Sequence, residues 1–318
     1  MKRIAAFILC LCMVFALCAC DNAEPQPTAE PTDTYTPVTF TNNGKKTTVS
    51  SLPEKVITAG PNCTEAFCAL GLNELVIGKC MENHSLGAPA EYKDAIDAIP
   101  TLSVGYPTAQ QIIDSGCDFI YANSWIFDDD LTIAQLEKAG ITVYVSEATD
   151  IDGIYKELHD IAKIFLVDSA KTVVSGLNER IDAVSAKIVG DITEPKKVFV
   201  LDSFIGDELY TAGGTNIESA YITAAGGANV FSELGKAWDA VEVSALVEAD
   251  PEYIIIHDYS GSDYDGKVAA LKAHPVLSQL SAVQNENFIR LSLENAFPSI
   301  RCADTVETIA QALYPDNF

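Results

Sequence analysis

The sequence predicts an α/β protein of two lobes, each built on a mostly parallel central sheet, with a single long spine helix joining them. Two observations carry this prediction. Short β-branched runs alternate with helical patterns in residues 55–145 and again after residue 195, and such alternation is typical of parallel sheets. Between these stretches, residues 151–189 show a helical pattern throughout. A helix of that length between two α/β halves is best placed as a connection between the lobes.

The first half alternates between strands and helices from residue 56 onward. The expected strands are 56–59, 75–78, 118–122 and 141–145, and the expected helices are 64–70, 109–114 and 131–139. Gly140 follows the last of these helices, where a glycine commonly ends a helix. This half is the N-terminal lobe, with expected bounds 38–150.

The middle of the chain carries apolar residues three or four positions apart, which form one face of a helix. They are Ile154, Leu158, Ile161 and Phe165, followed by Val173, Leu177, Ile181, Val184 and Ile188. Asp168 and Ser169 interrupt this pattern with residue types that favour a helix start. Residues 151–190 therefore predict a shorter helix followed by one of about 21 residues, roughly 30 Å long.

The alternation resumes in the C-terminal lobe, with expected bounds 191–318. The expected strands are 197–202, 253–257 and 287–291, and the expected helices are 217–225, 243–249, 268–271 and 301–313. The same alternation as in the first half predicts a second lobe of the same class.

Residues 1–19 have the layout of a secretory signal. Lys2 and Arg3 precede an apolar run that is shorter than the ~20 residues needed to span a bilayer. The run ends in Leu-Cys-Ala-Cys at 17–20, which resembles the lipobox of bacterial lipoproteins, and by that resemblance Cys20 is lipidated. Residues 20–37 are rich in Pro, Thr and acidic residues and predict a disordered tether. An N-terminal anchor helix and an unlipidated secreted protein are the alternatives.

Composition excludes several classes of function. The formal net charge of −25 would repel phosphate backbones, so nucleic acid is not an expected partner. Five cysteines remain after Cys20, namely Cys63, Cys68, Cys80, Cys117 and Cys302, and their odd number and irregular spacing do not indicate a disulfide framework. The chain has no G-x-S-x-G or H-E-x-x-H motif, so we do not expect an enzyme.

The order of several short motifs resembles the substrate-binding proteins of ABC importers for iron complexes and cobalamin. These motifs are VITAGPNCTE at 56–65, ALG at 69–71, VGY at 104–106, LEKAGI at 136–141, TAGGT at 211–215, AAGGANV at 224–230, Trp238 and ADPEYIII at 249–256. The resemblance covers residues 50–318. It implies a helical-backbone periplasmic binding protein fold, with the ligand held in the cleft between the two lobes.

The expected ligand-binding residues follow strands, because ligands of open α/β sheets bind beyond the carboxyl ends of the strands. Aromatic side chains dominate these segments and suit a broad planar or macrocyclic ligand. The candidates are Tyr106, Trp125, Tyr210, Trp238, Tyr259, Phe297 and Arg301, all but the last placed in loops. Packing between loop and lobe is the alternative for any one aromatic residue. The resemblance implies a cleft position for Trp238 and a ligand contact for Arg301.

Three residues are conceivable metal ligands. Val-Gly-Tyr at 104–106 resembles the segment in which haem-binding relatives use a tyrosine to ligate iron, so Tyr106 is one of them. The other two are His84 and His257, although a lone histidine is more often structural than a ligand. No cofactor of the protein's own is expected; the iron complex, haem or corrinoid would be its cargo.

Arginine is scarce after residue 20, at Arg180, Arg290 and Arg301 only. Strongly anionic complexes need several cationic partners, so a weakly charged ligand is favoured: a hydroxamate siderophore, a corrinoid or haem. The resemblance also implies docking on an ABC permease through one acidic residue in each lobe. The matching positions hold Gln110 and Ser244, with Glu242 and Glu248 close to the second.

The sequence thus predicts a monomeric, lipid-anchored receptor on the outer face of the cell membrane, which passes its ligand to an ABC permease. A ligand-sensing or adhesive surface lipoprotein without a transporter is the alternative.

Overall fold

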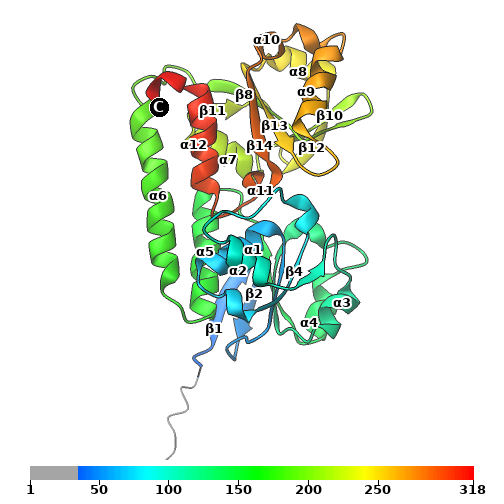
Figure 1. The fold of residues 1–318 in the computed structure, drawn as a ribbon, viewed down its shortest axis with the longest axis vertical. Helices are drawn as coiled ribbons and strands as arrows, with labels where there is room; N and C mark the ends of the chain where they lie inside the picture. The colour runs from blue at the N-terminus through cyan, green and yellow to red at the C-terminus, as the bar shows by residue number, and fades with distance from the viewer. Residues whose placement is uncertain (1–34) are drawn as a thin grey trace, which may run out of the picture. The chain divides into compact units, whose positions relative to one another are not determined.

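The computed structural model describes residues 35–318, and Pro37–Phe318 form one compact unit. Two parallel sheets organise this unit, and each has its own apolar core (Figure 1). This arrangement confirms the predicted α/β class with parallel central sheets. Within the described residues, no helix combines the length and the apolar character that crossing a membrane requires.

The first lobe is built on a five-stranded sheet in the order β5-β4-β3-β6-β7, with every pair parallel. Its strands are β3 (Val56–Ala59), β4 (Val76–Cys80), β5 (Thr101–Ser103), β6 (Phe119–Asn123) and β7 (Thr142–Ser146). Its helices are α1 (Pro61–Ala69), α2 (Lys93–Ala98), α3 (Ala109–Asp114) and α4 (Ile133–Lys138), with short 3-10 turns η1 (Asn73–Leu75), η2 (Glu82–His84) and η3 (Ser124–Ile126).

Local sequence explains how these helices begin. Thr108 and Thr132 each cap the next helix, and a glutamine three residues later completes a capping box in both cases. Gly60 joins β3 to α1 with φ of +132°, a conformation that side chains disfavour. A Cβ atom at Gly60 would lie 2.1 Å from Asn123 Nδ2, so only glycine lets the buried amide of Asn123 approach this turn.

An antiparallel hairpin precedes the first sheet and was not expected from the sequence. Its strands are β1 (Val38–Asn42) and β2 (Lys45–Val49). Asn42 attaches the hairpin to β7, because its side chain accepts a hydrogen bond from Val145 N at 2.7 Å and donates one to Val145 O at 2.8 Å.

Two helices follow, α5 (Ile151–Ile164) and α6 (Ser169–Ile188). Their break coincides with the predicted interruption at Asp168 and Ser169, but Asp168 makes no side-chain cap. The 20-residue α6 is the predicted spine, and Figure 1 shows it beside α12 (Cys302–Leu313), against which it packs.

The second lobe contains two sheets. The parallel sheet has the order β11-β8-β13-β14, with strands β8 (Lys196–Leu201), β11 (Gly227–Asn229), β13 (Tyr253–Asp258) and β14 (Phe288–Ser292). The antiparallel sheet has the order β12-β10-β9, with strands β9 (Ser203–Ile205), β10 (Glu208–Ala212) and β12 (Trp238–Glu242). The helices are α7 (Ile217–Ala224), α8 (Val243–Ala249), α9 (Tyr264–Ala273), α10 (Ser281–Gln284), α11 (Leu293–Ala296) and α12, with 3-10 turns η4 (Leu277–Gln279) and η5 (Pro315–Asn317).

The antiparallel sheet corrects one prediction. Tyr210 and Trp238 were placed in loops, but they lie in β10 and β12. The five cysteines that follow Cys20 are all buried and free in residues 35–318.

Candidate functional site

A cavity of about 130 Å³ lies where the two lobes meet. The first lobe contributes the carboxyl ends of β6 and β7 and the segments that follow them, as is usual for open α/β sheets. The second lobe contributes the start of α7, the start of β12 and the end of α11 with the residues beside them. The lining residues are Asn123, Ser124, Trp125, Ser146, Glu147, Ala148 and Thr149 from the first lobe, and Thr215, Asn216, Ile217, Ala237, Trp238, Ala296, Phe297 and Pro298 from the second. We call it the aromatic cavity.

Three of the predicted ligand-binding residues line the aromatic cavity: Trp125, Trp238 and Phe297. The rings of Trp125 and Phe297 lie 5.8 Å apart, so an aromatic pair connects the lobes at this point. Both tryptophans of the chain are therefore cavity residues, since the sequence contains only two.

Two more predicted residues contact these rings without lining the cavity. Tyr106 meets Trp125 edge to face at 5.9 Å and is 56% exposed. Tyr210 stacks on Trp238 at 5.6 Å with 15° between the rings. The strand register explains this stack: Tyr210 pairs with Ala240 and Ala212 with Trp238, which makes Tyr210 and Trp238 diagonal neighbours on one face of the sheet.

A reciprocal amide pair adjoins the aromatic cavity through Asn123, which lines it. Asn62 and Asn123 exchange two hydrogen bonds, each of 2.9 Å, and both side chains are buried. Asn62 also donates to Pro298 O at 3.0 Å, which joins the amide pair to the second lobe. Asparagines after strands are visible in the sequence, but their mutual pairing across 61 positions is not.

Arg301 does not line the aromatic cavity. Its guanidinium donates to both carboxylate oxygens of Glu65, at 2.8 and 2.5 Å, and to Gly87 O at 2.8 Å. Glu65 lies in α1 of the first lobe, so the pair crosses between the lobes, and the two side chains are only 11% and 2% exposed. Burial raises the pKa of Glu65, and Arg301 opposes that effect. The structure thus gives Arg301 an interlobe ion pair where the sequence predicted a ligand contact.

His257 is fully buried and contacts the aromatic cavity through the ring of Trp238. Its Nδ1 lies 3.1 Å from Asp202 Oδ1 and its Nε2 lies 2.8 Å from Glu218 Oε1. These contacts occupy both ring nitrogens, which leaves neither free for a metal. Tyr259 is likewise set back from the cavity, where its hydroxyl donates to Asp202 Oδ2 at 3.3 Å. Sequence reasoning missed both carboxylates, because Asp202 and Glu218 lie 55 and 39 positions from His257.

The remaining predicted residues are placed as follows. The side chain of His84 lies outside the described part of the structure, as does Cys20. Glu242 precedes α8 and Glu248 lies within it, and both side chains are exposed. Ser244 donates a hydrogen bond to Glu242. Gln110 is exposed on α3. Within residues 35–318, no cluster of three or more His, Cys, Asp or Glu side chains could hold a metal ion.

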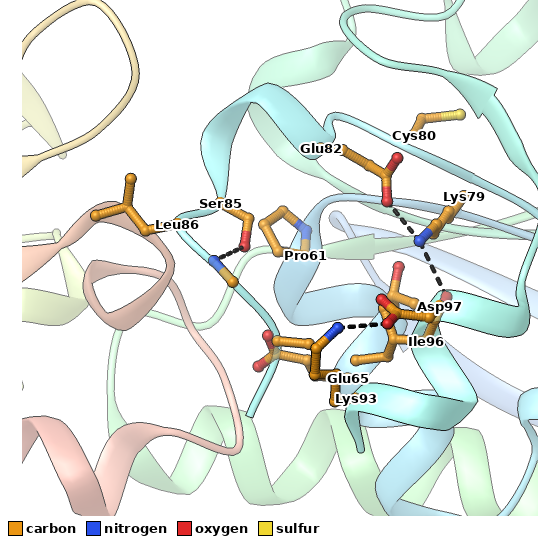
Figure 2. Close-up of a pocket in the computed structure, with 13 residues that line it drawn as sticks. Pro61, Glu65, Lys79, Cys80, Glu82, Ser85, Leu86, Lys93, Ile96 and Asp97 are labelled. Atoms are coloured by element: carbon orange, nitrogen blue, oxygen red, sulfur yellow. Dashed lines mark hydrogen bonds and ion pairs between the residues drawn. The ribbon is translucent and has the colours of Figure 1, made fainter. Parts of the chain in front are cut away.

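A larger cavity of about 530 Å³ lies in the first lobe between α1, α2 and β4 (Figure 2). It is lined by five charged side chains, and each of them has a partner of opposite charge. The pairs are Lys79–Glu82, Lys93–Asp97 and Glu65–Arg301. Because these charges are already satisfied by the protein, the cavity offers no free charge to recognise a ligand. The aromatic cavity is therefore the stronger candidate site.

Comparisons with known proteins agree with this geometry. The sequence profile of one family, described as "Periplasmic binding protein", matches residues 56–293. The chain is 24% identical, over 100% of its own length and 99% of the other, to an uncharacterized ABC transporter substrate-binding lipoprotein, YvrC, of Bacillus subtilis. It is 22% identical to a cobalamin-binding protein of Halobacterium salinarum, over 98% of this chain and 85% of that protein.

A solved structure also shares the fold. The crystal structure of an ABC-type Fe3+-hydroxamate transport system protein from Saccharomonospora viridis superimposes with a TM-score of 0.75 at 24% identity, covering 88% of this chain and 100% of the other. This likeness supports the two-lobed helical-backbone fold.

Proposed function

The chain belongs to the periplasmic binding protein family, and from this membership and the aromatic cavity we propose that it is the substrate-binding lipoprotein of an ABC importer. It captures a broad, uncharged metal complex between its lobes and delivers it to a permease. The lining of the cavity is the main support for this class of ligand. It combines aromatic rings with amides and hydroxyls and contains no Lys, Arg or His.

Charge narrows the ligand class. A strongly anionic ferric catecholate, or the propionates of haem, would require charge-assisted donors, whereas the one ionisable side chain that lines this cavity is the acidic Glu147. A corrinoid presents a flat macrocycle, which suits Trp125 and Trp238, and peripheral amides, which suit Asn123 and Asn216. The Halobacterium relative is named a cobalamin-binding protein. We therefore favour a corrinoid.

A neutral ferric hydroxamate is the second candidate, because it too needs no cationic partner. The Saccharomonospora neighbour is described as part of an Fe3+-hydroxamate transport system. Haem is supported less well: Tyr106, the tyrosine proposed as an iron ligand, is outside the cavity lining and in contact with Trp125.

The two tryptophans make the proposal directly measurable. We expect cyanocobalamin to quench the intrinsic tryptophan fluorescence saturably, and Trp238→Ala to weaken its binding by more than ~1 kcal/mol. Ferrichrome and haemin serve as the competing probes, and Phe318→Ala, an exposed aromatic far from the cavity lining, is the matched control. Saturable binding of ferrichrome alone would assign the hydroxamate, and binding of none of the three would contradict the proposal.

Anchoring and docking are part of the same proposal. Residues 1–19 would be the signal, Cys20 the lipidated residue and residues 20–37 the tether, ahead of lobes at 38–150 and 191–318 joined by 151–190. The YvrC relative, named a substrate-binding lipoprotein of an ABC transporter, supports an importer over a sensing or adhesive lipoprotein without a permease. The exposed carboxylates Glu242 and Glu248 would meet the permease. Cys20→Ala should abolish incorporation of a labelled fatty acid into the protein; incorporation that persists in this variant would contradict lipidation at Cys20.

A further inference from the structure

The second lobe contains a buried charge network that the capture of a ligand does not by itself require. His257 lies near the end of β13 with 0% exposure, between Asp202 after β8 and Glu218 on α7. Ionised carboxylates only accept hydrogen bonds, and a neutral imidazole has a single N–H. Two carboxylate partners therefore favour an imidazolium, in which both ring nitrogens donate.

The electrostatics agree with this assignment. Burial alone would lower the pKa of His257, but the charge of Glu218 and the hydrogen bond that His257 donates to Asp202 raise it to about 9. Burial would raise the pKa of Asp202, but its hydrogen bond with His257 lowers it. Glu218 Oε2 is buried with no hydrogen-bond partner in residues 35–318, so His257 is the main polar partner of this carboxylate.

Two further titratable groups face this network. Lys267 on α9 donates to His257 O at 2.7 Å and lies 4.3 Å from the centre of the Tyr259 ring, whose hydroxyl donates to Asp202. Burial lowers the pKa of Lys267 to about 8. Mutation is therefore needed to decide whether a change in Trp238 fluorescence or in ligand affinity at alkaline pH comes from His257 or from Lys267.

The network contacts the aromatic cavity through one side chain. The imidazole of His257 meets the indole of Trp238 edge to face, with ring centres 5.8 Å apart and 77° between the planes. Tyr210 stacks on the same indole at 5.6 Å. Trp238 is thus held by a tyrosine and by a cation, and an aromatic ring attracts a nearby cation through its quadrupole.

We infer that His257, held as an imidazolium between Asp202 and Glu218, is a positioning residue for Trp238, and that ligand capture weakens when His257 loses its proton. His257 is fully buried and absent from the cavity lining, so it acts through Trp238. The inference rests on the proposed function, because it assumes that Trp238 contacts the ligand.

The first test needs no ligand. In the Trp125→Phe protein, Trp238 is the only tryptophan, and an imidazolium in contact with an indole quenches its fluorescence more strongly than a neutral imidazole does. We expect its emission to rise between pH 7 and 10 with a midpoint near pH 9, the pKa of His257. Burial raises the pKa of Tyr210, which limits quenching by a phenolate in this range.

Two variants identify the side chain that causes this rise in emission. His257→Gln should abolish it, and a rise that persists in this variant would come from Lys267 and overturn the inference. Asp202→Asn keeps a hydrogen-bond acceptor but removes a charge, so the midpoint should fall by at least about one pH unit. A midpoint that Asp202→Asn leaves unchanged would equally overturn it, and this variant keeps the test decisive if His257→Gln does not fold.

The second test uses cyanocobalamin and the chain with both tryptophans. Its Kd should rise at least about fivefold between pH 7 and 10, and His257→Gln should remove that dependence. A constant Kd alongside a normal emission rise would overturn the coupling and leave the proposed function intact. If neither cyanocobalamin nor ferrichrome binds at any pH, the proposed function is overturned, and so is the inference that His257 affects ligand capture. The emission data would still test whether His257 contacts Trp238 as an imidazolium.

Discussion

Among single residues, Arg301 shows how burial changes the effect of an ion pair on the free energy of unfolding. Arg301 and Glu65 are almost fully withdrawn from solvent, so removal of one partner leaves a buried charge without compensation. We expect Arg301→Met to lower the free energy of unfolding by about 3–5 kcal/mol, measured by denaturant titration.

Arg180 provides the matched control. It also pairs with two carboxylates, Asp304 and Glu307, but its side chain is 42% exposed. Arg180→Met should therefore cost less than about 1 kcal/mol. A combined Arg301→Met and Glu65→Leu protein should recover only part of the loss, because it removes the charge of Glu65 but leaves the buried carboxylate of Glu294, which lies 3.5 Å from Arg301. Equal losses for the two single variants would contradict this account of burial.

His257 and Lys267 make the free energy of unfolding depend on pH in opposite directions over two different pH ranges. The folded state raises the pKa of His257 from 6.5 to about 9, so its contribution is complete below pH 6.5 and is lost as the pH rises through 9. Lys267, whose pKa falls from 10.5 to about 8, has the opposite effect, and stability recovers between pH 8 and 10.5.

Between pH 6.5 and 8, therefore, the contribution of His257 changes while that of Lys267 does not. Thermal unfolding of the unmodified protein should show Tm falling across this window, and His257→Gln should flatten the profile. A Tm that falls equally in both proteins would assign the effect to other groups.

Sequence reasoning expected three of the aromatic residues that line the cavity, but not their polar partners. Trp125 and Phe297 were expected there because segments that follow strands of an α/β fold form its ligand cleft, and Trp238 was expected there from the family resemblance. The role of Arg301 could not be predicted, because Glu65 lies 236 positions away and nothing local marks it as a partner. The position of a charged residue in the sequence gives no measure of its burial.

Among the elements, the spine helix α6 contains an unusual residue for its place. Gly176 lies in the interior of α6, and a Cβ atom there would have no neighbour within 4 Å. Gly176→Ala should therefore raise the free energy of unfolding by about 0.5–1 kcal/mol, since alanine restricts the unfolded chain and favours the helix.

Gly226 is the contrasting case. It has φ of +81°, and a Cβ atom would lie 2.9 Å from both Tyr314 and Ile192. Gly226→Ala should destabilise the protein by at least about 1 kcal/mol. Denaturant midpoints that shift in the same direction for both variants would contradict the distinction.

Element prediction succeeded where apolar pattern is strong. The parallel strands β3, β6, β8 and β13 are buried runs of apolar residues, and α6 repeats its apolar face over five turns. The sheet of β9, β10 and β12 was missed because β9 and β12 have few buried residues, and β10 pairs with β12 across an intervening helix. Such pairing depends on tertiary context more than on local pattern.

At the scale of the whole unit, several polar bonds join the two lobes. Besides Arg301 and Glu65, Asn62 donates to Pro298 O at 3.0 Å and Leu86 N donates to Glu294 Oε1 at 3.0 Å. The cavity of about 130 Å³ is smaller than the 300–1,000 Å³ typical of small-molecule sites. A macrocycle must therefore be admitted by movement of side chains, of lobes, or of both.

The interlobe bonds favour movement of side chains. Opening the lobes would break the buried ion pair and the bond from Asn62 to Pro298, whereas Trp125 is already 36% exposed at the cavity and Tyr106, which contacts it, is 56% exposed. We therefore expect small-angle scattering to give radii of gyration that differ by less than about 1 Å with and without cyanocobalamin, against about 19 Å expected for a compact unit of this size. The Arg301→Met protein, which lacks the interlobe ion pair, should show a larger difference. A decrease of several ångströms in the unmodified protein would instead mean that the lobes close on the ligand as a hinge.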